Sequence, residues 1–129
     1  MTPWIRWTAV AAATLIASAC AMPPPAPAAP AMAMDGVLVG SNQMTLYTFD
    51  RDVAASGKSV CNGPCANNWP PLMAAADAKD AGDWVVITRD DGGRQWSFKG
   101  KPLYFWVKDS KPGDKTGDGF NNVWRLARP

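Results

Sequence analysis

The sequence contains no histidine and no glutamate: its 11 acidic residues are all aspartates, beside 13 lysines and arginines in 129 residues. Without histidine there is no Ser–His or Cys–His catalytic pair, no histidine metal ligand and no histidine-ligated haem. The lack of glutamate argues against long surface helices, where glutamate is a favoured residue. A net charge of +2 gives no electrostatic case for a nucleic-acid partner. We therefore expect one small domain and no enzyme activity.

The N-terminus has no apolar run long enough to span a bilayer, but it has the pattern of an export signal. After Arg6, the apolar run 7–17 is shorter than the roughly 20 residues of a spanning helix. Small residues then precede Cys20, as in a bacterial lipoprotein, although Ala17 stands where such sites usually have leucine. We expect a signal peptide over residues 1–19 and a lipid on Cys20. Ordinary cleavage after Ala19, giving a secreted soluble protein, is the alternative.

Cysteine is scarce, and its odd number favours lipidation. A lipid on Cys20 leaves Cys61 and Cys65 as a pair in an oxidising compartment. The residues Gly63-Pro64 between them are expected to block a helix and to place both cysteines on a tight loop. The Cys-x-x-x-Cys spacing, without a βαβ context, favours a structural disulfide contributing about 2 kcal/mol. A redox-active or metal-binding thiol pair is the alternative.

Residues 21–34 contain only alanine, proline and methionine, a composition that predicts an extended spacer. Together with Cys20 they form a tether over residues 20–34, which leaves residues 35–129 for the folded domain. Thioethers can bind Cu(I), but no cysteine or histidine joins these methionines, so we interpret them as apolar linker residues and expect no metal site or cofactor.

The folded part shows mostly the alternating pattern of short β-strands bounded by turn residues. Residues 91–93, Asp-Gly-Gly, predict a hairpin turn, and a third strand is expected to extend that hairpin into a meander. Only residues 73–81 have an alanine-rich, helix-like composition. The predicted fold is therefore mainly β: a small antiparallel domain with little helix. Its expected strands are 36–40, 44–49, 84–88, 95–98, 103–107 and 123–126.

One pattern, Leu-Tyr-x-aromatic-x-x-Asp, occurs at residues 46–52 and again at 103–109, which predicts two related strand–turn halves. On each strand the tyrosine and the second aromatic share one face. The opposite face is apolar in the second copy and half exposed in the first, and each aspartate is placed to accept N–H groups of a turn. We interpret the motif as core aromatics and turn caps. Its residues are Tyr47, Phe49, Asp52, Tyr104, Trp106 and Asp109.

These two copies, Tyr47-Thr-Phe-Asp-Arg-Asp52 and Tyr104-Phe-Trp-Val-Lys-Asp109, resemble the Tyr-x-(Phe/Trp/Tyr)-x-x-Asp motif of the bacterial secreted-repeat lipoproteins. Also similar to that family are Cys61-Asn-Gly-Pro-Cys65, the segment 69–72 (Trp-Pro-Pro-Leu) and the ending Gly117-Asp-Gly to Trp124. The resemblance covers nearly the whole domain. It implies a cell-envelope location, and it brings no established biochemical activity.

The loop Asp114–Asn122 has some features of a Ca²⁺-binding loop, with oxygen-bearing side chains at Asp114, Thr116 and Asp118. An EF-hand loop also needs a glutamate at its twelfth position, where this chain has Arg125. A solvated β-turn loop is the favoured interpretation, and weak Ca²⁺ binding is the alternative.

Together these features predict an envelope-anchored lipoprotein that acts as a non-catalytic binding or structural module. Its partners would be the membrane, through an N-terminal lipid, and an envelope protein or ligand. The alternative is a periplasmic redox or copper-handling protein that uses Cys61 and Cys65.

Overall fold

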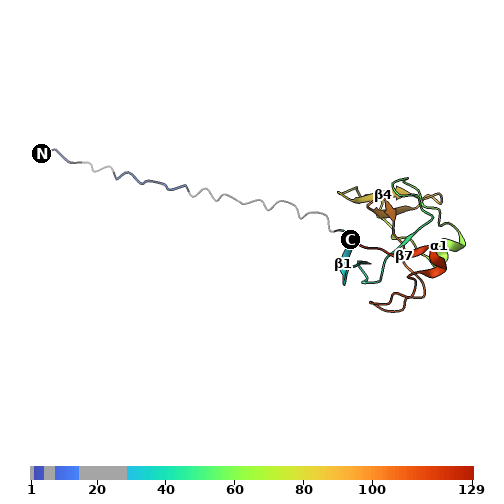
Figure 1. Ribbon diagram of the computed structural model, residues 1–129. Helices are drawn as coiled ribbons and strands as arrows, with labels where there is room; N and C mark the ends of the chain where they lie inside the picture. The colour runs from blue at the N-terminus through green and yellow to red at the C-terminus, as the bar shows by residue number, and fades with distance from the viewer. Residues whose placement is uncertain (1, 5–7, 15–28) are drawn as a thin grey trace.

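Short antiparallel strands, one α-helix and one 3-10 helix form the folded part of the computed structural model, which describes residues 2–4, 8–14 and 29–129 (Figure 1). No helix in these ranges is long and apolar enough to cross a membrane. The elements in chain order are β1 (Ala31–Met34), β2 (Val37–Gly40), β3 (Tyr47–Phe49), α1 (Pro64–Asn68), β4 (Trp84–Thr88), β5 (Arg94–Phe98), β6 (Lys101–Pro102), η1 (Phe120–Asn122) and β7 (Trp124–Leu126).

The strands form three small antiparallel sheets, β1-β2, β3-β7 and β4-β5-β6, so the prediction of a mainly antiparallel β domain is confirmed. The expected hairpin of residues 84–88 and 95–98 is present, with Trp84 opposite Phe98 and Thr88 opposite Arg94. The third strand of that meander was expected at residues 103–107, but it is β6, which ends before them. The chain leaves the sheet after Pro102 and pairs with a different part of the molecule.

Two related halves follow one plan. Each begins with a hairpin (β1-β2 or β4-β5), continues through one copy of the repeated motif, and ends in a short closing segment that starts with a tryptophan, Trp69 or Trp124. The closing segments are exchanged between the halves. β7 of the second half pairs with β3 of the first half. In return, Phe105 N–H of the second motif donates to the carbonyl of Pro70 in the first closing segment (2.7 Å).

The two halves meet at the motif tyrosines. Tyr47 N–H donates to the Tyr104 carbonyl (2.8 Å), and Tyr104 N–H donates to the Tyr47 carbonyl (3.0 Å). Such a reciprocal pair is typical of antiparallel strands. It places an approximate twofold axis between these two residues. The C-terminus lies near β1 (Figure 1), and the N–H of Leu38 in β2 donates to the carbonyl of Ala127 (2.9 Å).

Two rings, each of three backbone hydrogen bonds, lie at the leucine core. This core is the buried cluster of Ala31, Leu38, Leu46, Leu72, Leu103 and Ala127. In one, Leu38 donates to Ala127, Ala127 to Leu46, and Leu46 back to Leu38, each at 2.9 Å. The related ring joins Leu103 and Trp96 of the second half to Leu72 of the first. In it, Leu72 donates to Leu103, Leu103 to Trp96, and Trp96 to Leu72, at 2.9–3.1 Å. Each ring contains a residue from the other half's closing segment, so neither half closes its own ring.

Four aromatic rings form a continuous stack across the axis. Phe49 stacks on Trp124 (centroids 4.3 Å apart), Trp124 on Trp69 (3.8 Å) and Trp69 on Trp106 (4.0 Å). The second aromatic of each motif therefore packs on the tryptophan of the other half. Tyr47 meets Trp69 edge-on in the same way that Tyr104 meets Trp124, at 5.3 and 5.2 Å. Aromatic pairs of these geometries stabilise a core beyond their buried area.

The folded unit begins earlier than the sequence analysis expects. Residues 31–34, assigned there to the spacer, form β1, and Ala31 is buried in the leucine core. The turn that joins β1 to β2 is Asp35-Gly36, with φ of 52° and 75°. Asp-Gly with positive φ at both positions is a favoured two-residue hairpin turn. The dipeptide taken as the start of the domain is therefore the turn of its first hairpin.

Two expectations about helices are wrong. Residues 73–81 form no helix, because the Arg94 guanidinium takes the carbonyls of Ala75, Ala76 and Ala78 at 2.7, 2.5 and 2.9 Å. The Gly63-Pro64 pair was expected to block a helix, yet α1 begins at Pro64. Proline is tolerated in the first helical turn, where its missing N–H would have had no partner in the helix.

The first motif strand is more buried than expected. Leu46 and Thr48, on the face predicted to be half exposed, are both buried, and only Asp50 on that face reaches solvent. Leu46 packs in the core cluster with Leu103 of the second half and Ala127 of its closing segment, contacts that the sequence pattern of one strand alone could not show.

Replacing a tryptophan of the aromatic stack should lower the free energy of unfolding more than replacing a tryptophan outside it. Replacing Trp124 by leucine removes contacts with Phe49, Trp69 and Tyr104, and we expect it to lower the free energy of unfolding by about 2–4 kcal/mol. The control Trp84→Leu, at a half-buried tryptophan outside the stack, should cost about 1 kcal/mol. Urea unfolding followed by far-UV circular dichroism measures both. Equal losses would contradict the central role of the stack.

Candidate functional site

The motif tyrosines and aspartates form two hydrogen bonds that cross between the halves. The Tyr47 hydroxyl donates to Asp109 Oδ2 (2.6 Å), and the Tyr104 hydroxyl donates to Asp52 Oδ2 (2.5 Å). Both tyrosines are fully buried. Each tyrosine therefore uses the aspartate of the other motif copy, and the sequence pattern alone did not indicate this exchange.

The second oxygen of each aspartate caps a loop, as the sequence analysis expects. Asp52 Oδ1 accepts the N–H of Val60 (2.8 Å). Asp109 Oδ1 accepts the N–H and the hydroxyl of Thr116 (3.0 and 2.6 Å). Each aspartate thus joins three parts of the fold: the end of its own motif strand, the following loop and the tyrosine of the other half.

Burial changes the acid–base behaviour of these groups. Loss of solvent raises the pKa of both tyrosine hydroxyls well above the usual value, and the hydrogen bonds to Asp109 and Asp52 raise it further. Burial also raises the pKa of Asp52, more than the hydrogen bonds from Tyr104 and Val60 and the charge of Arg89 lower it. Both tyrosines are therefore protonated donors at neutral pH.

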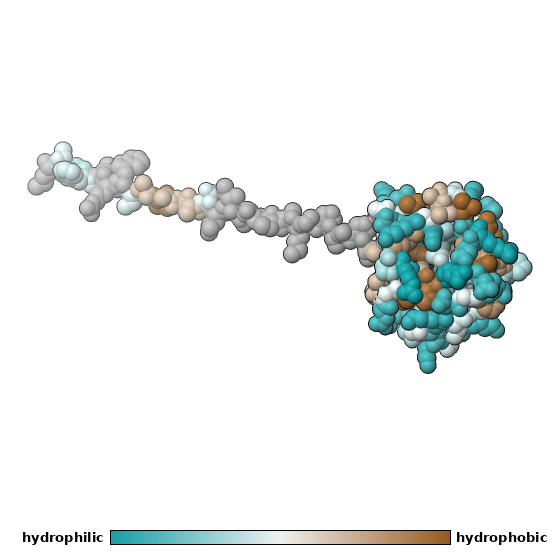
Figure 2. Space-filling view, viewed as in Figure 1, coloured by the Kyte–Doolittle hydropathy of each residue, from teal (hydrophilic) through white to brown (hydrophobic). Residues whose placement is uncertain are grey.

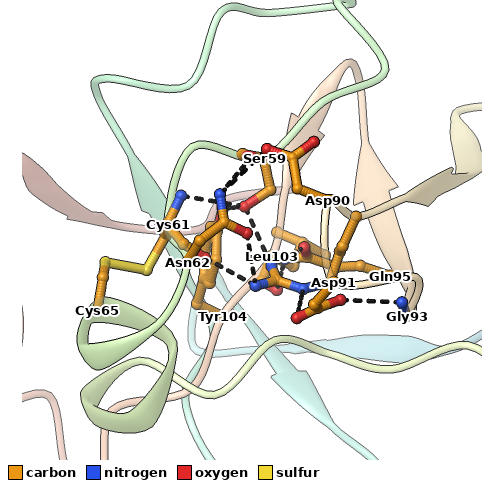
Figure 3. Close-up of polar contacts among 11 residues, drawn as sticks. Ser59, Cys61, Asn62, Cys65, Asp90, Asp91, Gly93, Gln95, Leu103 and Tyr104 are labelled. Atoms are coloured by element: carbon orange, nitrogen blue, oxygen red, sulfur yellow. Dashed lines mark hydrogen bonds and ion pairs between the residues drawn. A yellow bond between two sulfur atoms is a disulfide. The ribbon is translucent and has the colours of Figure 1, made fainter.

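A buried arginine, Arg89, is hydrogen-bonded to the cysteine loop, and Figure 3 shows Ser59, Cys61 and Tyr104 of its surroundings. The side chain of Arg89 is only 1% exposed. Its Nη1 donates to Ser59 Oγ (3.1 Å) and Gln95 Oε1 (2.8 Å), and its Nη2 donates to the Cys61 carbonyl (2.7 Å). Its Nε pairs with the exposed carboxylate of Asp91 at 3.1 Å. Buried charges need such partners, because their transfer from water is costly.

The arginine connects the cysteine loop to the crossed pairs. Ser59 Oγ accepts from Arg89 and lies 2.6 Å from the Tyr104 hydroxyl, which in turn donates to Asp52. The pKa of Asp91 is lowered by the hydrogen bond from the Gly93 N–H and by its bond to Arg89. Sequence analysis missed Arg89, because Arg89-Asp-Asp-Gly-Gly carries only the signal of a turn.

Cys61 and Cys65 are joined by a disulfide that links the loop before α1 to the first turn of that helix. Cys61 is fully buried, its carbonyl accepts from Arg89 (2.7 Å) and its N–H donates to Ser59 Oγ (3.3 Å). The disulfide thus holds the loop that supplies the Ser59 and Cys61 acceptors to the arginine.

The polar atoms of this arrangement are engaged within the fold. Among the described residues, no buried side-chain nitrogen or oxygen lacks a hydrogen-bond partner. The crossed pairs, the arginine and the disulfide therefore form a connected structural network. The tyrosines and aspartates of the motif lie in this network, and its other aromatic residues, Phe49 and Trp106, lie in the aromatic stack.

Oxygen-bearing side chains of the loop of residues 114–122 take part in hydrogen bonds within the fold. Asp114 Oδ2 accepts from the N–H and hydroxyl of Ser110 (2.8 and 3.0 Å) and from the N–H of Lys111 (3.2 Å). These bonds lower the pKa of Asp114. The Thr116 hydroxyl donates to Asp109. Within residues 2–4, 8–14 and 29–129, no three cysteine or aspartate side chains are grouped as metal ligands would be.

The expected lipid-bearing residue, Cys20, lies outside the described residues, as do residues 21–28 of the expected spacer. Met32 and Met34 of that spacer lie in β1, with exposed side chains.

The fold and its network define a duplicated β domain in which a repeated Tyr-x-aromatic-x-x-Asp motif locks two halves together. A family model described as "Secreted repeat of unknown function" matches residues 31–73 and 85–128, which are the two halves. The chain belongs to this family. Membership indicates an extracellular or envelope location. No curated protein and no solved structure matches the chain.

The raised tyrosine pKa values predict a loss of stability in alkaline solution. Above the ordinary value of 10.0, the unfolded chain loses its tyrosine protons while the folded chain keeps them. The free energy of unfolding should therefore fall as the pH rises, by about 1.4 kcal/mol per pH unit for each tyrosine. Urea unfolding between pH 9 and 11.5 measures this slope.

The chain has only two tyrosines, so variants can separate their effect from that of the lysines. Tyr47→Phe and Tyr104→Phe should each reduce the alkaline fall in the free energy of unfolding by about 1.4 kcal/mol per pH unit. The double variant should reduce it by about twice that amount. A slope that is the same in all four proteins would show that neither hydroxyl is held protonated by the fold.

Proposed function

We propose that this protein is a non-catalytic module of the bacterial envelope, anchored by a lipid on Cys20 and acting through the surface of its folded domain. The observation that carries the proposal is that both copies of the family motif are used to hold the two halves together. A motif whose hydroxyls, carboxylates and rings are all committed to internal contacts supplies stability rather than a reacting group.

The chemistry of the network supports this proposal. A nucleophile or general base needs a group poised to give or accept a proton near neutral pH. The tyrosine hydroxyls have a raised pKa and already donate to carboxylates, and the buried arginine already has several acceptors. We therefore place the function on the surface, as binding of an envelope partner or ligand or as a structural role.

A redox or copper-handling role for Cys61 and Cys65 finds less support. Thiol–disulfide exchange needs access of an attacking thiolate to a sulfur. Cys61 is fully buried, which leaves only the partly buried Cys65 open to attack. The disulfide also holds the loop that carries Arg89 acceptors, so opening it would cost stability. This role is the contrary outcome of the experiment below.

The experiment is the intact mass of the protein from the membrane fraction of a bacterial host, with thiol alkylation before and after reduction. We expect a mature chain that starts at Cys20 and carries a lipid-sized addition. We also expect two alkylatable thiols that appear only after reduction. The variant Cys20→Ala should lose the added mass and leave the membrane fraction, and Cys61→Ser/Cys65→Ser should keep the lipid.

A chain that stays in the soluble fraction without added mass would contradict the anchored module. Thiols at Cys61 and Cys65 that are alkylated without reduction, in folded protein, would favour the redox or copper role instead.

A further inference from the structure

A small cavity of about 270 Å³ opens at the seam between the two halves, and it combines an apolar floor with a positively charged rim. The floor includes Leu38, Leu103 and Ala127, which belong to the two hydrogen-bond rings of the core. Four cationic side chains also line it: Lys99, Lys101, Arg125 and Arg128. None of the ten lining residues is acidic. On the face that Figure 2 shows, hydrophobic residues lie in separate areas between hydrophilic ones.

The two halves differ in side-chain size at two positions that line the cavity, Thr48 and Phe98, whose counterparts are Phe105 and Gly40. Thr48 borders the cavity in the first motif, and Phe105 holds the corresponding place in the second. The Phe105 ring packs so closely on β2 that a Cβ added at Gly40 would come within 2.8 Å of it. In one half the large Phe105 ring meets the small Gly40, and in the other the small Thr48 and the large Phe98 line the cavity.

The positive charge is also confined to this side of the approximate axis. Aligned on the motif and on the closing tryptophans, the four cationic residues correspond to uncharged residues of the other half: Asn42, Met44, Pro70 and Met73. Internal pairing is limited. Arg125 pairs with Asp50 at 3.1 Å, Arg128 donates a long hydrogen bond to the Gly36 carbonyl (3.3 Å), and Lys99 lies over the Phe98 ring at 5.3 Å.

We propose that this cavity binds a small anionic amphiphile, with a phosphate or carboxylate head at the cationic rim and a short alkyl group on the leucine floor. Cations at the rim would attract the charged head group. Packing of the alkyl group against the floor would remove its apolar surface from water, which favours binding. The volume is below that of pockets for drug-sized ligands, so it suits a head group and a few carbons. This site names the ligand class for the binding role proposed above, and it rests on that role.

The test is a titration of the folded Cys20→Ala chain with hexyl phosphate, followed by backbone amide shifts in two-dimensional NMR. We expect saturable shifts centred on Leu38, Phe98 and Ala127, with binding that weakens as salt is added. Inorganic phosphate has only the charged head group and hexanol has only the alkyl chain, so each should bind at least about tenfold more weakly than hexyl phosphate.

Three variants place the ligand in the cavity. Thr48→Phe copies the second half and should reduce the affinity at least about tenfold by filling the space. Lys99→Gln/Lys101→Gln should reduce it about three- to tenfold and flatten the salt dependence. The control Lys108→Gln/Lys111→Gln removes the same charge from exposed residues outside the cavity and should leave the affinity unchanged. The lysine variants keep the test valid if Thr48→Phe fails to fold.

Vesicles then separate the two sources of such a ligand. Sedimentation with phosphatidylglycerol-containing vesicles, but not with pure phosphatidylcholine vesicles, together with loss in Lys99→Gln/Lys101→Gln, would identify a lipid head group. Binding of hexyl phosphate without vesicle binding would identify a free amphiphile.

Absence of saturable hexyl phosphate binding, equal binding of inorganic phosphate, or unchanged affinity in both cavity variants would each overturn the inference. None of these results alters the mass and alkylation pattern that tests the anchored module, so the two proposals can fail separately.

Discussion

Each motif tyrosine donates its hydrogen bond to the aspartate of the other copy, so neither half can satisfy its own motif. The same exchange recurs in the aromatic stack, in the closing strands and in the two backbone rings. A buried tyrosine hydroxyl and a buried carboxylate are costly without partners, and here each supplies the partner for its counterpart in the other half. The two halves are therefore parts of one cooperative unit.

The approximate twofold symmetry of the two halves separates residues with a structural role from candidates for a binding site. The residues that obey it are held in the interior by reciprocal contacts, and they include every member of the repeated motif. The departures from it, a buried arginine beside the disulfide in one place and a threonine-lined cationic cavity in another, have no counterpart across the axis. The arginine holds a loop in place, whereas the cavity opens to solvent. Our proposed binding site therefore lies where one copy has diverged from the other.

Local signals in the sequence predicted the hairpin of residues 84–88 and 95–98, which is confirmed. The export signal stays a prediction, and the last four residues of the expected spacer form β1 instead. The motif was recognised, and its aspartates do accept turn N–H groups. Its exchange between halves was not predictable, because a tyrosine and an aspartate on one strand give no sign of which copy each will meet. A long-range contact also outweighs the helix propensity of residues 73–81. The Arg94 side chain donates hydrogen bonds to backbone carbonyls that a helix there would use.

The most direct test of the crossed motif is a pair of double-mutant cycles on the free energy of unfolding. One cycle combines Tyr47→Phe with Asp109→Asn, which are hydrogen-bonded across the halves, and the other combines Tyr47→Phe with Asp52→Asn, within one motif copy. We predict a coupling energy of about 1–3 kcal/mol in the first cycle and additivity within about 0.5 kcal/mol in the second. Coupling within one copy and additivity across the halves would contradict the account.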